Sequence, residues 1–245
     1  IRGLRPRPTS SRTSDAVKTL GVLGGMSAES TALYYRELNR LVRERLGGLH
    51  SAELLIRSVD FAPIADLQAK DDWAATGAIL AEAARRLESA GAEAIILATN
   101  TMHLNADAIR AAIGVPFLHI GDATAAALKA RDVKRPLLLA TRFTMEKDFY
   151  KDRLRAAGLD PLVPDQADRD RLQAIIYDEL CQGVVKPTSK AAGMTMVERG
   201  LAAGADGVIF GCTEVGMLLE PRDIDVPVVD TTLVHCEAAV DFALG

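Results

Sequence analysis

Two residues of this 245-residue chain, Thr99 and Cys212, place a hydroxyl and a thiol at matching points of an internal repeat. The segment AGAEAIILATNT at 90–101 aligns without a gap with AGADGVIFGCTE at 203–214, which sets Thr99 opposite Cys212. Each copy is an apolar, strand-like run that ends in small polar residues. A duplicated half with one such group at each strand end predicts chemistry between two facing groups, as in a cofactor-independent racemase or epimerase.

Each member of this pair also has a purely structural interpretation. Cys212 lies where a strand meets a helix, and a helix N-terminus lowers the pKa of a thiol and supplies a reactive thiolate. The alternative is a small buried apolar side chain. Thr99 at the equivalent strand end is either its partner or a helix cap. Cys181 and Cys236 lie within helical patterns and are expected to be structural.

Polar residues next to the pair predict a binding site for a carboxylate. Asn100, Thr101 and Thr213 supply amide, hydroxyl and backbone N–H groups, which bind carboxylates at helix N-termini. Glu214 and Asp60 are each either an acid/base group or a helix cap. The sequence leaves the roles of other side chains near strand ends open. Met26 follows a tight Gly-Gly turn that lacks a phosphate-loop pattern. Arg142 either binds a carboxylate or is a surface charge, and His103 could orient a site group.

The composition excludes several classes of function. Hydrophobic residues make up 49% and charged residues 25% of the chain, as in ordinary globular proteins. A net charge of −4 and an aromatic content of 4% argue against nucleic acid or a membrane as partner. The histidines and the three cysteines have no metal-ligand spacing and no disulfide framework, so we expect no metal and a reducing compartment, the cytoplasm.

Residues 1–17 are predicted to be an N-terminal extension. The segment 1–16 is rich in Arg, Ser and Pro, and its one acidic residue is Asp15. This composition is typical of a loosely attached tail. It is also typical of an organelle transit peptide, so organelle import is the alternative to a cytoplasmic location.

Apolar runs and helical patterns alternate along the rest of the chain. We predict strands at 18–23, 54–59, 95–98, 115–120, 136–140, 159–163, 208–211 and 226–229. We predict helices at about 29–45, 73–89, 105–113, 123–130, 145–157, 169–182, 189–202 and 232–243. Continuous apolar strands between helices indicate parallel sheets covered on both faces. The sequence therefore predicts an α/β fold of two pseudo-symmetric halves, with ligands at the carboxyl ends of the strands.

Four motifs resemble the aspartate/glutamate racemase family, and the resemblance covers about residues 18–245. They are LGGMSAEST (23–31), ATNTMH (98–103), ATRFTMEKDFY (140–150) and FGCTEVG (210–216). The superfamily also includes hydantoin racemases, arylmalonate decarboxylases and maleate isomerases. The resemblance implies two Rossmann-like domains, 18–118 plus 226–245 and 119–225, with the active site at their interface. It also implies no cofactor, a small-molecule amino acid as substrate and a homodimer.

The resemblance also assigns roles to individual residues. Most members have a Cys at both strand ends, whereas this chain has Thr99 and Cys212, as in the branch that acts on L-aspartate and L-glutamate. Cys181 stands where aspartate-specific members have a Lys that binds the side-chain carboxylate. The substrate-binding residues expected from the motifs are Met26, Gln68, Asn100, Thr101, Thr141, Thr144, Thr213 and Glu214.

The implied reaction is a two-base inversion at Cα. Cys212 removes the proton of the L-enantiomer, and Thr99, which does not titrate near neutral pH, donates one on the opposite face. Asn100, Thr101 and Thr213 stabilise the enolate-like transition state by donating to the α-carboxylate. Two alternatives stay open. One is a decarboxylase or isomerase of the same superfamily that uses a single Cys, and the other is a protein that binds an amino acid or dicarboxylate without turnover.

Overall fold

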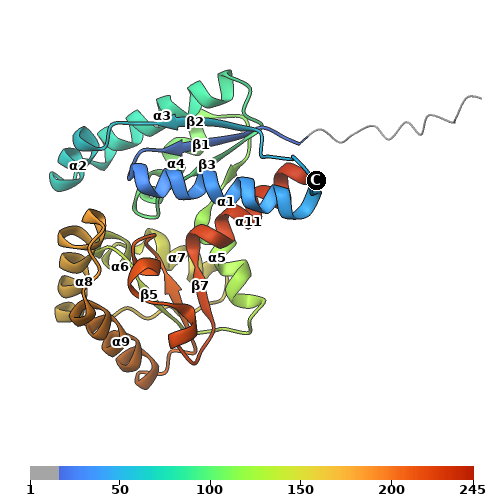
Figure 1. Ribbon diagram of the computed structural model, residues 1–245. Helices are drawn as coiled ribbons and strands as arrows, with labels where there is room; N and C mark the ends of the chain where they lie inside the picture. The colour runs from blue at the N-terminus through green and yellow to red at the C-terminus, as the bar shows by residue number, and fades with distance from the viewer. Residues whose placement is uncertain (1–16) are drawn as a thin grey trace, which may run out of the picture.

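The computed structural model describes residues 17–245 as two α/β halves, one above the other in Figure 1. The predicted N-terminal extension lies almost wholly outside the described residues. The first half contains β1 (Leu20–Gly24), α1 (Ala28–Leu46), β2 (Leu54–Ser58), α2 (Phe61–Ala69), α3 (Trp73–Ser89), β3 (Ala94–Leu97), η1 (Thr101–Asn105), α4 (Ala106–Ala112) and β4 (Phe117–Leu118). No helix among the described residues is long and apolar enough to cross a membrane.

The second half follows without a long connection. It contains α5 (Ile120–Lys129), β5 (Pro136–Leu139), α6 (Arg142–Glu146), α7 (Asp148–Ala156), α8 (Gln166–Asp178), η2 (Leu180–Gln182), α9 (Pro187–Ala202), β6 (Gly207–Phe210), α10 (Val215–Leu218), η3 (Pro221–Asp223), β7 (Val228–Asp230) and α11 (Thr231–Leu244). The α/β class, with parallel sheets flanked by helices, is as the sequence predicted.

The two sheets have the same topology. The first has the order β2-β1-β3-β4 and the second the order β5-β6-β7, and all pairs are parallel. An isolated parallel β-bridge pairs Leu162 with Leu137 of β5. Leu162 thus occupies the edge of the second sheet that corresponds to the position of β2 in the first. β3 and β6, which carry the repeated segments, therefore occupy equivalent positions.

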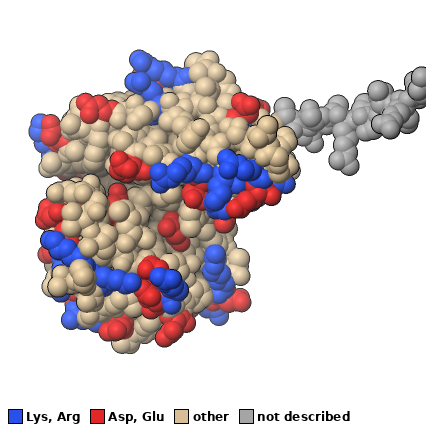
Figure 2. Space-filling view, in the orientation of Figure 1, with Lys and Arg blue, Asp and Glu red and all other residues tan. Residues whose placement is uncertain are grey.

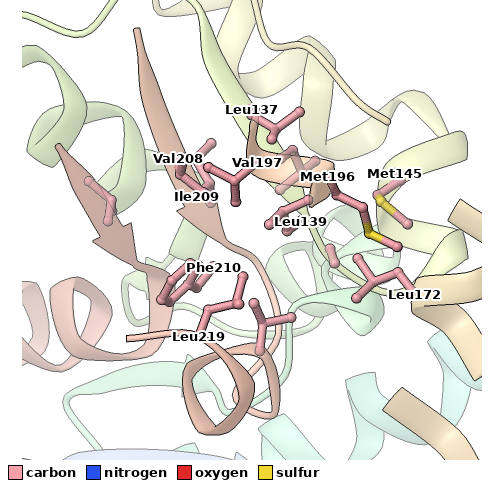
Figure 3. Close-up of a cluster of buried hydrophobic side chains, with 14 of the residues drawn as sticks. Leu137, Leu139, Met145, Leu172, Met196, Val197, Val208, Ile209, Phe210 and Leu219 are labelled. Carbon is pink, nitrogen blue, oxygen red and sulfur yellow. The ribbon is translucent and has the colours of Figure 1, made fainter. Parts of the chain in front are cut away.

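Both faces of the first sheet are buried, which explains the continuous apolar strands. Leu20 and Val22 of β1 pack toward α1 and α11. Leu23 and Ile95 point to the opposite face of the sheet and pack toward α3. In the second half, α8 and α9 cover β5 and β6, and Figure 3 shows the buried cluster that they form there. Its labelled members are Leu137, Leu139, Met145, Leu172, Met196, Val197, Val208, Ile209, Phe210 and Leu219.

Several segments differ from the prediction, and three of them have a clear local cause. The segment 159–163 is not a strand but makes only the Leu162 bridge, because Pro161 and Pro164 on either side have no N–H to extend a ladder. Helix α2 was not predicted, and Asp60 begins it by accepting from the backbone N–H of Ala62. The helix predicted at 145–157 begins earlier, at Arg142, and is interrupted by extended backbone at Lys147.

The C-terminal segment crosses between the halves. The predicted division assigns 226–245 to the first domain, but β7 pairs with β6 in the second sheet. Only α11 returns to the first half, where it packs against α1. The sheets therefore divide at the start of α11, a few residues after the predicted boundary, because the strand completes one sheet before its helix covers the other.

Candidate active site

A pocket of about 670 Å³, which includes space open to solvent, lies between the two halves. The residues that line it are Met26, Ser27, Ser30, Tyr34, Phe61, Gln68, Thr99, Asn100, Thr101, Met102, Thr141, Ile176, Tyr177, Cys181, Gly211, Cys212, Thr213, Glu214 and Thr232. All the predicted site residues except Thr144 are in this set. Thr144 is completely buried and lies behind the lining.

The ends of the two central strands bring the candidate pair together. Thr99 follows the last residue of β3, Leu97, by two positions, and Cys212 follows the last residue of β6, Phe210, by two positions. Since parallel strands present their carboxyl ends at one edge of the sheet, each side chain emerges into the crevice where ligands bind in such folds. The sequence repeat thus becomes a pair of equivalent positions in one pocket.

The backbone of Thr99 is held by a buried histidine. His103 Nε2 accepts from the backbone N–H of Ile120 at 3.2 Å, so its proton is on Nδ1, which donates to the Thr99 carbonyl at 2.7 Å. Burial, followed by the nearby His119 and His235, lowers the pKa of His103 well below its usual value. His103 is therefore neutral, and its Nδ1–H holds the Thr99 carbonyl.

The Asn100 amide nitrogen is bound to Thr231 and is not the expected donor to a ligand. Thr231 donates its hydroxyl proton to the Phe210 carbonyl at 2.9 Å, so its oxygen must accept from Asn100 Nδ2, also at 2.9 Å. The Asn100 amide is fixed by this bond, and its Oδ1 has no hydrogen-bond partner among residues 17–245. A buried acceptor without a partner calls for a donor. Asn100 is 7% exposed and is one of the residues that line the pocket, although Oδ1 itself is buried.

Three threonine hydroxyls join the two halves beside the pair. Thr101 Oγ1 lies 2.9 Å from Thr141 Oγ1 and 3.3 Å from Thr144 Oγ1, and the last two are 3.2 Å apart. Thr101 and Thr141 face the pocket, and each hydroxyl can rotate toward a ligand oxygen. Thr144 instead supports the other two from behind.

Cys212 is paired with Glu214. The Cys212 thiol donates to Glu214 Oε2 at 2.8 Å, and the Thr213 hydroxyl donates to the same oxygen at 2.6 Å. The Thr213 proton is thus directed to Glu214 and not, as expected, to a substrate carboxylate. Glu214 is an acceptor for the thiol rather than a helix cap, because no side-chain capping bond is made at α10.

The acidity of Cys212 differs from the expectation. Burial, with Glu214 as the second cause, raises the pKa of the thiol well above its usual range. The expected net lowering by a helix N-terminus is therefore wrong. The backbone N–H of Glu214 acts to lower the pKa, but burial and the Glu214 carboxylate outweigh it. Cys212 is a protonated thiol near neutral pH.

A glycine turn and a side-chain hydrogen bond position the residues of the pocket wall in the first half. Gly25 has φ +98°, and a Cβ there would lie 2.2 Å from the Val59 carbonyl oxygen, so the turn before Met26 requires glycine. Gln68 donates to Met102 Sδ at 2.9 Å, which holds α2 against η1. This turn and this contact place the side chains of Met26, Gln68 and Met102 on the wall.

Other sequence candidates lie outside the pocket, and some lining residues were not foreseen. Asp60 caps α2, and the exposed Arg142 side chain lies 4.0 Å from Asp170. Within the part of the chain that the structure describes, no group of three or more His, Cys, Asp or Glu residues could hold a metal. Sequence reasoning did not assign a role to Ser27, Ser30, Tyr34, Phe61, Met102, Ile176, Tyr177, Gly211 or Thr232. Ser27, Ser30, Met102 and Gly211 lie within the motifs quoted above, whereas no motif marks the other five.

Two pseudo-symmetric α/β halves, with a hydroxyl and a thiol at equivalent strand ends in a shared pocket, define a two-domain protein of the racemase type. The family model described as Asp/Glu/Hydantoin racemase matches residues 23–239. The chain belongs to this family, and as an enzyme it is an amino acid racemase, which is an isomerase.

Individual relatives agree with this assignment. The chain is 23% identical over 233 residues, 92% of its length and 98% of the other protein, to the broad specificity amino-acid racemase RacX of Bacillus subtilis (strain 168). It is similar to a solved structure from Yersinia pestis that carries the Asp/Glu racemase name, with a TM-score of 0.89, 48% identity and coverage of 93% of this chain and 100% of that chain. PH1733 from Pyrococcus horikoshii OT3, described as an aspartate racemase homologue, gives a TM-score of 0.83, 34% identity and the same coverage.

Proposed function

We propose that this protein inverts the configuration at Cα of a free amino acid, without a cofactor, by proton transfer on two faces of the substrate. Cys212 is the base toward the L-enantiomer, and Thr99 acts on the opposite face. The observation that carries the proposal is the placement of both residues at equivalent ends of β3 and β6, in one pocket. Aspartate and glutamate, which the resemblance implies, are the first substrates to assay.

Glu214 completes the base. As Cys212 takes the Cα proton, its own thiol proton passes to Glu214 Oε2 along the existing 2.8 Å hydrogen bond. The pair thus gains one proton in total and returns it to solvent later in the cycle. This route needs no free thiolate before the substrate binds, which agrees with the raised pKa of the thiol.

Thr99 donates its hydroxyl proton to Cα from the other face and regains one from solvent. An alcohol is a poor base near neutral pH but serves as a proton donor, so the two directions are kinetically unequal and L to D is favoured. The equilibrium constant between enantiomers is still one. His103, through the Thr99 carbonyl, keeps this residue in position.

The zwitterionic end of the substrate has matching partners. Asn100 Oδ1, which has no partner among the described residues, accepts from the ammonium group. The Thr101 and Thr141 hydroxyls donate to the α-carboxylate, on which negative charge grows as the proton leaves. Donors fixed toward developing charge are a large source of transition-state stabilisation.

The test is proton NMR in deuterated buffer with a panel of L-amino acids that includes aspartate and glutamate, followed by their D-isomers. We expect loss of the Cα–H signal from an L-substrate with the wild type and no loss with Cys212→Ala, whose fold is checked by circular dichroism. Release of carbon dioxide from malonates would instead identify a decarboxylase. Saturable binding with no exchange in any member of the panel would identify a binding protein.

We also propose the homodimer and the cytoplasmic location that the resemblance and the composition imply. Light scattering tests the first and cell fractionation the second.

A further inference from the structure

The pocket is polar at one end and mostly apolar along its walls. The polar end comprises Asn100, the threonine hydroxyls and the Cys212–Glu214 pair. The walls come from both halves and are mostly apolar. The first half gives Met26, Phe61 and Met102 together with the uncharged polar residues Ser27, Ser30 and Gln68, and the second gives Ile176 and Tyr177 of α8. Tyr177 is 43% exposed, and Cys181 on η2, which also lines the pocket, is exposed. A substrate whose Cα group occupies the polar end therefore meets uncharged and mostly apolar side chains along these walls.

The charge of the pocket points the same way. Of the described residues that line it, Glu214 alone has an ionisable carboxyl or basic side chain, and none is Lys or Arg. Cys181 adds no charge, because burial, and after it Glu214, raises the pKa of its thiol to about 11. Tyr177 is likewise neutral, since burial raises the pKa of its phenol further.

A second carboxylate on the substrate is poorly served by these surroundings. On entering the pocket it would lose hydration without gaining a cationic partner, and a buried charge is costly unless it is paired. It would also add negative charge near Glu214, which opposes removal of the Cα proton. An uncharged side chain meets neither penalty, and an apolar one gains from burial.

We infer that the preferred substrates of this site are amino acids with an uncharged side chain, and not dicarboxylic amino acids. The inference rests on the proposed function and specifies its substrate class. The wall formed by Ile176, Tyr177 and Cys181 then determines specificity, because it is the surface along which the side chain lies.

Isosteric substrate pairs test the inference on the wild-type protein. L-Glutamine and L-glutamate have the same shape and differ in charge, and L-methionine adds an apolar chain of similar length. We expect kcat/KM for Cα–H exchange to be on the order of tenfold or more higher for glutamine and methionine than for glutamate, since the penalty falls on the charged chain. A ratio of glutamine to glutamate below about threefold would overturn the inference.

A variant that adds a cation gives an independent check. Cys181→Lys introduces the missing partner, and Cys181→Met changes the length in the same way without charge. We expect the lysine variant to lower the glutamine-to-glutamate ratio by about tenfold and the methionine variant to keep it. A lysine variant that folds but leaves the ratio unchanged would show that the side chain does not lie along this wall.

The two proposals fail in different ways. If no amino acid of either class exchanges its Cα–H, the proposed racemase function is wrong. If glutamate and aspartate exchange as well as their amides, the enzyme is a racemase but the inference about its substrate class is wrong.

Discussion

Replacing Glu214 by glutamine separates two roles that the carboxylate plays toward Cys212. It accepts the thiol proton, with Sγ and Oε2 2.8 Å apart, and it keeps the thiol protonated through its negative charge. Glu214→Gln retains the shape and a hydrogen-bond acceptor but removes both the charge and the ability to take up the proton. The variant should therefore make the thiol more acidic and the enzyme slower.

The direction of each effect follows from the geometry. Oε2 lies 2.8 Å from Sγ, so removing the carboxylate charge removes a like-charge repulsion that disfavours the thiolate, and the pKa of the Cys212 thiol falls. Loss of a general acid–base partner typically lowers turnover by about 10²–10⁴-fold. We expect kcat for the L-substrate to fall by about 10²–10³-fold, because part of the loss is offset by the more acidic thiol.

Two measurements on the same variant test whether the thiol becomes more reactive while Cα–H exchange becomes slower. Cα–H exchange by NMR gives kcat and KM, and alkylation by iodoacetamide at neutral pH, followed by peptide mass spectrometry, gives the reactivity of Cys212 apart from that of Cys181. We expect at least about tenfold faster alkylation together with slower exchange. Glu220→Gln, at an exposed glutamate that contacts Lys190 and Arg222, is the matched control and should change neither. Exchange within threefold of wild type in Glu214→Gln would refute the role of Glu214 as proton acceptor.

Three further predictions concern the opposite face, the ammonium site and the buried histidines. Thr99→Cys should raise the D to L rate of exchange, and loss of both directions in a folded variant would refute the assigned roles. Asn100→Leu should raise KM by roughly 10–100-fold, the value of a hydrogen bond to a charged group, while an analogue without the ammonium binds both proteins equally. Burial lowers the pKa of His119 to about 3 and that of His235 to about 4, whereas unfolded histidine titrates near 6.5. Because the unfolded state binds more protons below pH 6.5, the free energy of unfolding measured in urea has its full value above pH 6.5 and decreases as the pH falls toward 4. His119→Asn should reduce the slope of this pH dependence.

The sequence predicted the seven strands that the structure describes, their order along the chain and the paired positions, and it also predicted a strand at 159–163 that does not form. Buried parallel strands are continuous apolar runs, and a repeat with equal spacing reaches equivalent strand ends, so Thr99 and Cys212 could be identified without coordinates. Glu214 could be named for the same reason, since it lies two residues from Cys212. These features depend on residues close together in the chain, where periodicity and turn chemistry are informative.

The tertiary structure decided the chemical state of these groups. The orientation of the Asn100 amide depends on Thr231, the tautomer of His103 on Ile120, and the acidity of Cys212 on its burial. The pocket walls likewise join α2 and η1 of one half to α8 and η2 of the other, as Figure 1 shows for α2 and α8 on the same side of the molecule. On the face drawn in Figure 2, Lys and Arg are interspersed with Asp and Glu. Hydrogen-bond direction and desolvation arise from atoms brought together by folding, and a linear pattern does not record them.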